Sequence, residues 1–331
     1  MWIVCFFEKN KFMVRKIKLH LFGLVFLSFS FLLVLSCSSD DDKELTFPLS
    51  ADIFNSVSDR QVAFQGLTHN AVAWSWDFGD GNTSTEQNPV HVYESGGYYT
   101  AVLTATDNTG GVVTDEVQLA IALTPYVLLT GGPTNINGKT WKLAPSHSTN
   151  GDYFAWANQD LSPFEGTPDP LPDGAFNLFL GMPEVYDDEF TFHFDGSYEV
   201  NVLTGAAFSG YIYQLFTTGG AGIVNAGGAS FGLCTGLYTP ETAATFTYEA
   251  EEDYTILSAI AGGPLTYPGV STIDFSEGSY LGFLDFNRKV IIQEITDSSM
   301  KMVVFASLDF AAAQAGGAST HGFVLSFEVV N

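Results

Sequence analysis

The segment 74–81 (WSWDFGDG) constrains the fold of this chain more than any other stretch. Its three aromatic residues alternate with Ser75 and Asp77, so an extended backbone would present one apolar face and one polar face. Asp80-Gly81 follows directly, and such a pair tolerates the positive φ angles of tight hairpin turns. The segment therefore predicts a half-buried strand that runs into a hairpin turn.

Short, regularly spaced strands on both sides of this segment predict an all-β sandwich over residues 48–123. In the strand 99–107, alternate residues are apolar and the residues between them are mostly threonines, so one face would enter the core. Trp76 is the expected central core residue. The strands are predicted at 51–56, 61–67, 74–78, 89–93, 99–107 and 112–123.

Three motifs in this region resemble the PKD domain. They are Trp76-Asp-Phe-Gly-Asp-Gly81, His91-Val-Tyr93 and Gly97-x-Tyr99-Thr-x-x-Leu103-Thr-x-Thr-Asp107. The resemblance implies an immunoglobulin-like sandwich that serves as a spacer or interaction module in extracellular proteins, and it implies no catalysis. Asp77 and Asp80 could hold a cation, but turn formation alone also explains Asp80-Gly81.

Residues 1–37 predict an export signal rather than part of a domain. Basic residues between Lys9 and Lys18 precede a nearly uninterrupted apolar run, and Val34-Leu-Ser-Cys37 follows at once. This ending resembles a bacterial lipobox, in which the cysteine is diacylated and becomes the new N-terminus, so Cys37 is the expected lipidation site. An uncleaved membrane anchor is the alternative, and the true start stays open between Met1 and Met13.

Residues 38–47 predict an acidic tether, and the charge of the chain restricts its partners. Asp40-Asp-Asp42 resembles the signal that sends some bacterial lipoproteins to the outer face of the outer membrane, although a plain flexible tether explains it too. From residue 38 onward the chain has seven basic and 36 acidic residues, a net charge of −29, which disfavours nucleic acid and anionic lipid as partners. We expect a lipid-anchored outer-membrane protein that faces outside the cell and contacts the membrane only through its lipid.

Residues 124–137 predict a linker, and residues 138–331 predict a second, larger β domain. Its clearest hairpin joins strands at 190–194 and 197–202 through Asp195-Gly196. Together with the PKD-like sandwich, the pattern predicts an all-β chain whose second domain is an antiparallel jelly roll or lipocalin-like fold. Further strands are predicted at 139–143, at 245–248 and 254–257 around an acidic turn at 249–253, at 289–295 and 300–305, and at 321–330.

Two regions interrupt this strand pattern. Residues 146–188 show little periodicity but contain many aromatic residues, so we expect an ordered functional loop rather than disorder. Residues 200–240 contain nine glycines and no Lys, Arg, Asp or Glu. They predict either tight loops packed over the sheet or a flexible lid.

The motifs Gly138-Lys-Thr-Trp141 and Tyr186-Asp-Asp-Glu-Phe-Thr-Phe192, placed after a PKD domain, resemble an accessory domain of surface lipoproteins from bacterial polysaccharide-uptake systems. The resemblance covers chiefly residues 138–202. It implies a glycan-binding role in which an outer-membrane glycan transporter is a partner. Trp141, which is next to a hydrophobic strand position, is expected in the core.

The chain lacks the familiar patterns of a catalytic site. Its acidic cluster at 249–253 falls on a predicted turn, where carboxylates are normally solvated rather than paired across a cleft as in glycosidases. His147, His193 and His321 lack metal-ligand spacing, and the single cysteine of the mature domains, Cys234, is expected to fill the core. We predict no enzyme, no catalytic residue, no metal site and no cofactor. Calcium bound through oxygens of Asp187-Asp-Glu189 is the alternative left open.

The predicted glycan site lies in the loop 146–188. Sugars stack their apolar C–H faces on flat aromatic rings, while their hydroxyls bond polar groups at the rim. The expected binding residues are aromatic, amide or carboxylate side chains: Tyr153, Trp156, Asn158, Gln159, Asp160 and Tyr186. The competing interpretation is that these rings only cap the core.

The sequence thus predicts a non-catalytic surface lipoprotein that binds extracellular polysaccharide and presents it for uptake. Because the chain is strongly acidic, a neutral β-glucan or similar polymer suits it better than an acidic glycan. A structural or adhesive surface protein is the alternative, and a glycoside hydrolase comes third.

Overall fold

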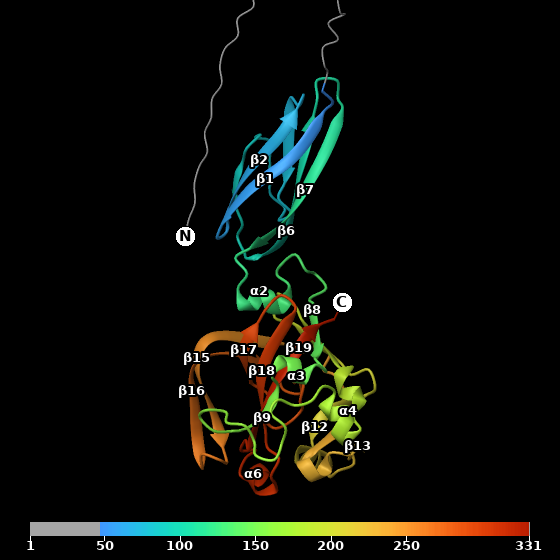
Figure 1. Cartoon of the computed structure of the whole chain (residues 1–331), viewed down its shortest axis with the longest axis vertical. Helices are drawn as coiled ribbons and strands as arrows, with labels where there is room; N and C mark the ends of the chain where they lie inside the picture. Colours follow the sequence, from blue (N-terminus) through green and yellow to red (C-terminus); the bar gives the residue numbers. More distant parts are fainter. Residues whose placement is uncertain (1–46, 331) are drawn as a thin grey trace, which may run out of the picture. The chain divides into compact units, whose positions relative to one another are not determined.

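The computed structural model describes residues 47–330, so the predicted export signal, Cys37 and residues 38–46 of the tether lie outside the described residues. Within this part, strands dominate and helices are short (Figure 1). The strands are β1 (Ser50–Ser58), β2 (Gln61–His69), β3 (Ala73–Asp77), β4 (Thr83–Ser84), β5 (Val90–Val92), β6 (Gly97–Thr106), β7 (Val112–Ile121), β8 (Lys139–Leu143), β9 (Tyr153–Trp156), β10 (Glu189–Phe192), β11 (Tyr198–Asn201), β12 (Ala206–Gly210), β13 (Ile223–Asn225), β14 (Leu233–Leu237), β15 (Phe246–Ser258), β16 (Gly263–Phe275), β17 (Val290–Ile295), β18 (Ser299–Ala306) and β19 (His321–Val329). The helices are α2 (Pro125–Thr130), α3 (His147–Asn150), α4 (Ala175–Leu180), α5 (Tyr211–Thr218) and α6 (Phe310–Gln314), with 3-10 turns η1 (Pro183–Tyr186) and η2 (Ala229–Phe231).

The first seven strands form a sandwich of two antiparallel sheets, ordered β1-β2-β5 and β4-β3-β6-β7. The alternation in β3 and β6 points apolar side chains inward, and Trp76 is completely buried, as the sequence predicts. The Trp76 ring packs against Phe64 at a centroid distance of 5.1 Å, and its indole N–H donates to the Glu86 carbonyl over 3.0 Å. Trp76 therefore belongs to the buried core of the sandwich, and its one polar group is hydrogen-bonded.

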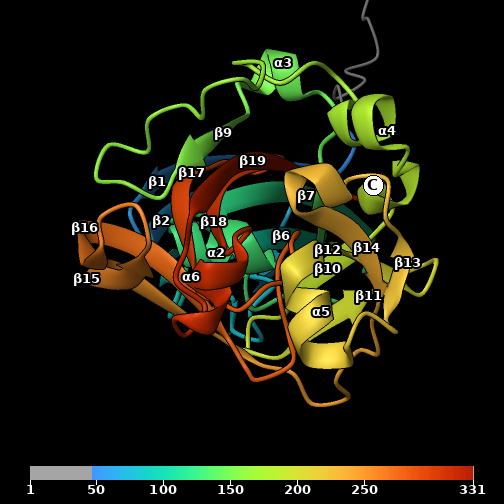
Figure 2. The same cartoon turned by 90° about the horizontal axis from the view of Figure 1, so that it is seen from below.

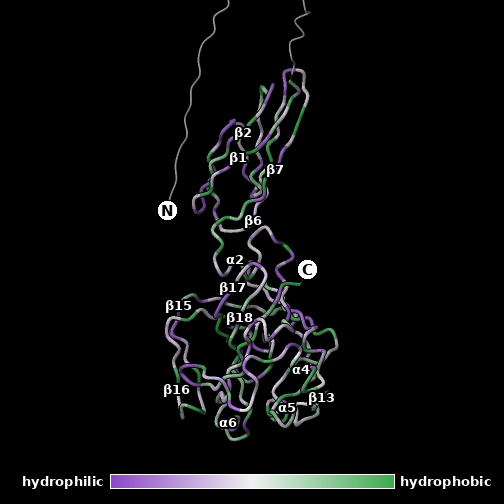
Figure 3. The backbone as a smooth tube through the Cα atoms, in the orientation of Figure 1, coloured by the Kyte–Doolittle hydropathy of each residue, from purple (hydrophilic) through white to green (hydrophobic). Residues whose placement is uncertain are grey.

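The later strands build one large antiparallel sheet of nine strands, ordered β11-β10-β8-β19-β18-β17-β16-β15, with β9 paired to β19. The sheet is curled rather than flat (Figure 2). Hydrophobic and hydrophilic segments follow one another along the chain of this domain (Figure 3), and β18 ends in the continuous buried apolar run Met302–Ala306. The prediction of an all-β chain, with a sandwich followed by a larger antiparallel β domain, is confirmed.

The acidic turn predicted at 249–253 is wrong. These residues lie inside β15, which pairs with β16 along its length, and shifts of register between Glu249, Glu252 and Tyr254 accommodate the irregularity. The side chain of Glu252 contacts Lys289 and Thr272, so one carboxylate of the cluster has partners on the sheet. Carboxylates on the outer face of a strand are solvated as they would be in a turn, which is why the sequence pattern misled.

Residues 200–240 form neither plain loops nor a lid. They contain a second small sheet, β12-β14-β13, and helix α5. The glycines allow close packing: a Cβ at Gly236 would lie 2.3 Å from the amide nitrogen of Gln214 on α5. Cys234 on β14 is buried, as predicted, and burial raises the pKa of its thiol to about 12.

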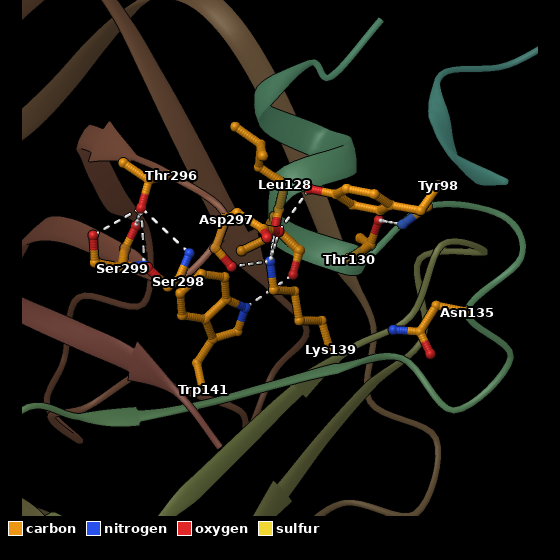
Figure 4. Close-up of polar contacts among 12 residues, drawn as sticks. Tyr98, Leu128, Thr130, Asn135, Lys139, Trp141, Thr296, Asp297, Ser298 and Ser299 are labelled. Atoms are coloured by element: carbon orange, nitrogen blue, oxygen red, sulfur yellow. Dashed lines mark hydrogen bonds and ion pairs between the residues drawn. The ribbon is translucent and has the colours of Figure 1, made fainter. Parts of the chain in front are cut away.

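The motif Gly138-Lys-Thr-Trp141 has a structural role at the start of β8 (Figure 4). Gly138 has φ +70°, and a Cβ there would lie 2.8 Å from the Phe192 carbonyl oxygen, so only glycine fits. The Lys139 ammonium donates to the Leu128 carbonyl over 2.9 Å and to the Asp297 carbonyl over 2.6 Å. Burial, partly offset by Asp297, lowers the pKa of Lys139.

Trp141 and the Asp297 carboxylate make further hydrogen bonds around Lys139. Trp141 is fully buried, as predicted, and its indole N–H donates to the Leu129 carbonyl over 2.9 Å. Asp297 accepts hydrogen bonds from Lys139 over 3.1 Å and from the Tyr98 hydroxyl over 2.6 Å (Figure 4). The segment predicted as a linker thus includes helix α2, whose carbonyls are tied to β8 through Lys139 and Trp141.

Within residues 47–330, no helix has the length and apolar character needed to span a membrane.

Candidate functional site

Strand β9 carries the predicted binding loop and is held at the edge of the large sheet by β19. The antiparallel register places Trp156 opposite His321 and Tyr153 opposite Val324. Because directly opposed residues on one sheet face have neighbouring side chains, the register alone brings an indole beside an imidazole. This edge therefore positions a pair of flat rings.

Three rings form a cluster at this edge, which we call the ring cluster: Trp156, Phe164 and His321. The Trp156 and His321 rings are stacked, with centroids 5.2 Å apart and planes 25° from parallel. Phe164 meets Trp156 edge-on at 4.5 Å and His321 at 4.6 Å. Trp156 is only partly buried, so it remains partly accessible from solvent.

The polar residues predicted beside Trp156 divide into two groups. Asn158 shapes the loop, because its amide N–H donates to the Ser162 hydroxyl over 2.7 Å and its carbonyl accepts from the Ser162 backbone N–H over 3.0 Å. Gln159 and Asp160 are exposed, and the Gln159 amide also donates to the Thr266 carbonyl over 3.2 Å. Among the predicted polar residues of this segment, only Gln159 and Asp160 are exposed, three and four positions after Trp156 in the sequence.

The two predicted tyrosines use their hydroxyls inside the protein. Tyr153 donates to the Leu161 carbonyl over 3.2 Å. The Tyr186 oxygen lies 2.9 Å from Nε2 of His147 and accepts from the Phe176 backbone N–H over 3.1 Å. Burial raises the pKa of both tyrosines. For Tyr186 the interpretation that it supports the core fits better than that of a glycan contact.

Tyr186 is the outer member of a buried network that sequence reasoning missed. His147 Nδ1 lies 2.7 Å from Oδ2 of Asp152, and Oδ1 of Asp152 accepts from the Ser326 hydroxyl over 2.6 Å. Both His147 and Asp152 are fully buried, so the network has no access to a substrate. No local pattern could reveal it, since Asp152 and Ser326 are 174 positions apart.

A mostly apolar cavity of about 600 Å³ lies next to the ring cluster. Phe164 and His321 belong to the ring cluster and also line the cavity, whereas Trp156 does not line the cavity. Burial lowers the pKa of His321 to about 4, so the imidazole is neutral at physiological pH. The cavity is lined by Phe154, Phe164, Gly166, Thr167, Pro168, Leu171, Ala175, Phe176, Phe179, Leu180, Ile212, Ala229, Ser230, Phe231, Gly232, Leu233, Leu308, His321 and Phe323.

Two buried carboxylic acids lie elsewhere in the domain. Burial raises the pKa of Asp188 to about 8 and that of Asp285 to about 7. Asp285 accepts from the backbone N–H groups of Phe286 and Ser307 at 2.7 and 2.8 Å, whereas Oδ1 of Asp188 has no hydrogen-bond partner among residues 47–330. Neither residue lines the cavity.

The carboxylates of Asp187-Asp-Glu189, the alternative calcium ligands, do not converge on one point. Asp188 is buried while Asp187 is exposed, and Glu189 accepts from the amide of Asn201 over 3.1 Å. In residues 47–330, no group of three or more His, Cys, Asp or Glu side chains is arranged to hold a metal ion.

Comparison with known proteins identifies the first domain. Residues 55–121 match the family model of the PKD domain, so this part of the chain is a PKD domain. The crystal structure of the PKD1 domain from the Vibrio cholerae metalloprotease PrtV aligns with 31% identity, covering 23% of this chain and all of that one, at a TM-score of 0.23.

The curated relatives are much longer proteins. Collagenase ColQ1 of Bacillus cereus is 48% identical over 50 residues, which is 15% of this chain and 5% of the collagenase. The pre-pro-metalloprotease PrtV of Vibrio cholerae is 36% identical over 83 residues, which is 25% of this chain and 9% of that protein. The chain thus spans less than a tenth of either relative.

A structure described as that of carbohydrate-binding modules of the β-sandwich superfamily aligns with 86% of this chain and 93% of its own length. The identity is 12% and the TM-score is 0.25.

Proposed function

We propose that this chain is a non-catalytic lipoprotein of the outer membrane, exposed on the cell surface, that binds extracellular polysaccharide and presents it for uptake. The observation that carries the proposal is the partly exposed Trp156 ring, stacked on His321 in a segment that also holds the exposed Gln159 and Asp160. A flat ring next to amide and carboxylate groups suits the apolar C–H face and the rim hydroxyls of a sugar.

The packing of Trp156 supports a binding role because the ring is held in place before any ligand arrives. His321 supports one face and Phe164 meets it edge-on. The amide of Gln159 is likewise fixed by the Thr266 carbonyl. Side chains that are already ordered lose little conformational entropy on binding, which improves affinity.

The charge of the domain supports a neutral polymer as the ligand. The chain beyond residue 37 carries a net charge of −29, which repels acidic glycans unless cations bridge them. A neutral β-glucan or a similar soluble polysaccharide is the ligand class we infer. Uptake would then depend on transfer to an outer-membrane glycan transporter.

The absence of catalysis is part of the proposal. No Asp or Glu is among the residues that line the cavity in the described part of the chain. The two carboxylic acids with raised pKa, Asp188 and Asp285, are buried outside it. A glycosidase needs two carboxyl groups facing each other across a sugar, roughly 5–10 Å apart.

A structural or adhesive surface protein is the second candidate. It is favoured by Tyr153, Asn158 and Tyr186, whose polar groups are satisfied within the protein rather than offered to a ligand. A PKD domain suits such a role as well as it suits glycan capture.

The test of the proposed function is affinity electrophoresis of the unlipidated secreted chain in gels that contain single polysaccharides. The panel should include neutral β-glucans and, as a charge control, acidic polymers. We expect retardation by at least one neutral polymer and none by the acidic ones. Retardation by no member of the panel would favour the structural or adhesive role.

A further inference from the structure

We propose that the cavity next to the ring cluster binds a small, ring-containing apolar molecule that carries one hydroxyl or N–H donor, with Nε2 of His321 as the acceptor. The cavity is bounded by residues of β9, α4, η2 and β19; of these elements β9, α4 and β19 are labelled in Figure 2. This ligand is distinct from the polysaccharide proposed to bind at Trp156, and the inference does not rest on that function.

The size and lining of the cavity define the ligand class. Its volume of about 600 Å³ falls within the range of pockets that hold drug-sized molecules. Most of its lining is apolar, and six lining residues are phenylalanines: Phe154, Phe164, Phe176, Phe179, Phe231 and Phe323. A sugar would leave most of its hydroxyls without partners there, which is costly, whereas an aromatic body would find ring faces and edges to contact.

The hydrogen bonds of Thr320 are compatible with a His321 tautomer that is protonated on Nδ1. The Thr320 hydroxyl donates its single proton to the Ala306 carbonyl over 3.2 Å, and it accepts from the Leu308 backbone N–H over 3.0 Å. Nδ1 of His321 lies 2.9 Å from the same oxygen. With the hydroxyl proton donated to the Ala306 carbonyl, Nδ1 is the protonated nitrogen and donates to Thr320, and this is the tautomer on which the proposal rests.

This assignment leaves a free lone pair on the other side of the ring. Within residues 47–330, no group hydrogen-bonds to Nε2 of His321, while its ring lines the cavity. The low pKa of His321, a result of burial, keeps this nitrogen unprotonated at neutral pH. Nε2 of His321 is thus a hydrogen-bond acceptor beside an apolar cavity, and a ligand with one donor group would satisfy it.

The rim of the cavity carries apolar side chains that a ligand would cover. Phe179 is 54% exposed and Phe231 is 57% exposed, and both line the cavity. Exposed large apolar side chains that gather around a concave site are typical of ligand-binding surfaces. They account for the hydrophobic part of the affinity, and His321 accounts for the selectivity.

The dye N-phenyl-1-naphthylamine is a suitable probe because it has an aromatic body, one N–H donor and a fluorescence that rises in apolar surroundings. We expect the full secreted chain to enhance its fluorescence saturably. Ser230, an exposed lining residue, can be changed to tryptophan to obstruct the cavity without entering the core. Ser230→Trp should abolish the enhancement, whereas the matched change at an exposed residue outside the cavity, Thr239→Trp, should leave it intact.

The donor requirement is tested by displacing the dye with 2-naphthol and with 2-methoxynaphthalene, which has no donor. One neutral hydrogen bond predicts that 2-naphthol displaces the dye at about fivefold lower concentration. His321→Phe keeps an aromatic ring beside Trp156 but removes the acceptor, so dye binding should persist and the preference should vanish.

Three results would overturn the inference. They are a chain that does not enhance the dye, equal enhancement by Ser230→Trp and Thr239→Trp, or equal displacement by the two naphthalenes with the unaltered chain. If His321→Phe fails to fold, the displacement ratio and the Ser230→Trp comparison still decide. None of these readouts involves Trp156 or a polysaccharide, so failure here is separate from failure of the proposed function.

Discussion

Nδ1 of His147 lies 2.7 Å from Oδ2 of Asp152, and neither side chain is exposed to solvent. Asp152 also accepts from the Ser326 backbone N–H over 3.1 Å and from the Ser326 hydroxyl over 2.6 Å. One carboxylate therefore joins the start of the loop 146–188 to the central strand β19. Such a buried group stabilises a fold only while all its partners are present.

Asp152→Ala should lower the free energy of unfolding by about 3–5 kcal/mol, because it leaves buried hydrogen-bond donors of His147 and Ser326 without an acceptor. Urea denaturation followed by intrinsic fluorescence measures this loss. Asp160→Ala is the control, since Asp160 is exposed in the same loop and should change stability by less than about 0.5 kcal/mol. Similar effects of the two substitutions would show that the network does not support the loop.

Trp76→Ala should destabilise the PKD domain by about 3–5 kcal/mol, since it removes a fully buried ring and its hydrogen bond to Glu86. Differential scanning calorimetry of the chain from residue 38 onward should show a transition that moves to lower temperature or disappears. Val90→Ala, at an exposed position of β5, should leave the calorimetric trace nearly unchanged. An unaltered trace for Trp76→Ala would mean that this ring does not hold the core together.

The PKD domain was readable from sequence because its information is local. The burial of Trp76 and of one face of β6 follows from the alternation of apolar and polar residues, and the Asp-Gly pair predicts the turn. The hairpin from β10 to β11 was predicted for the same reason. Where pattern, turn and strand length agree, a single sequence suffices.

The second domain was harder because its decisive contacts join distant segments. The pairing of Trp156 with His321 depends on the register between β9 and β19, which no local pattern specifies. The strand through residues 249–253 is not predicted from sequence, because its acidic residues are equally typical of a turn. In the Gly-rich segment 200–240, close packing depends on glycines that have no side chain, such as Gly236. Hydrophobic periodicity in the sequence does not indicate packing of this kind.

The buried acids predict how stability depends on pH. The pKa of Asp188 is raised from its ordinary value of 3.8 to about 8, so the folded state keeps a proton that the unfolded chain releases near pH 4. The folded state thus binds more protons between these values, and the free energy of unfolding should fall as pH rises from about 4 to about 8. Asp285, with a pKa raised to about 7, contributes in the same direction.

Asp188→Asn removes one of these titrations and should flatten the decline. Urea midpoints measured from pH 4 to pH 9 provide the comparison. The control is Asp160→Asn, at an exposed carboxylate that does not contribute to the raised pKa of Asp188, and it should leave the slope unchanged. A decline of the same steepness in both variants would remove Asp188 as its source.

Cys37→Ser tests the anchor, which lies outside the described residues. If Cys37 is the lipidated residue of a lipobox, its replacement should abolish incorporation of a labelled fatty acid and leave the precursor unprocessed or released. The measurement is metabolic labelling in a bacterial host, and Cys234→Ser serves as the control because that thiol is buried in the second domain. Labelling that persists in Cys37→Ser would remove the lipoprotein assignment.

The central claim, glycan binding at Trp156, is tested most directly by isothermal titration calorimetry of the chain from residue 38 onward with the neutral polysaccharide that retards it in gels. A stacking ring contributes on the order of 1 kcal/mol beyond its burial, so Trp156→Ala should weaken binding about tenfold without lowering the melting temperature. Phe310→Ala, which removes an exposed ring on α6, should bind like the unaltered chain. Unchanged affinity in Trp156→Ala, or a loss of affinity that comes with unfolding, would contradict the claim.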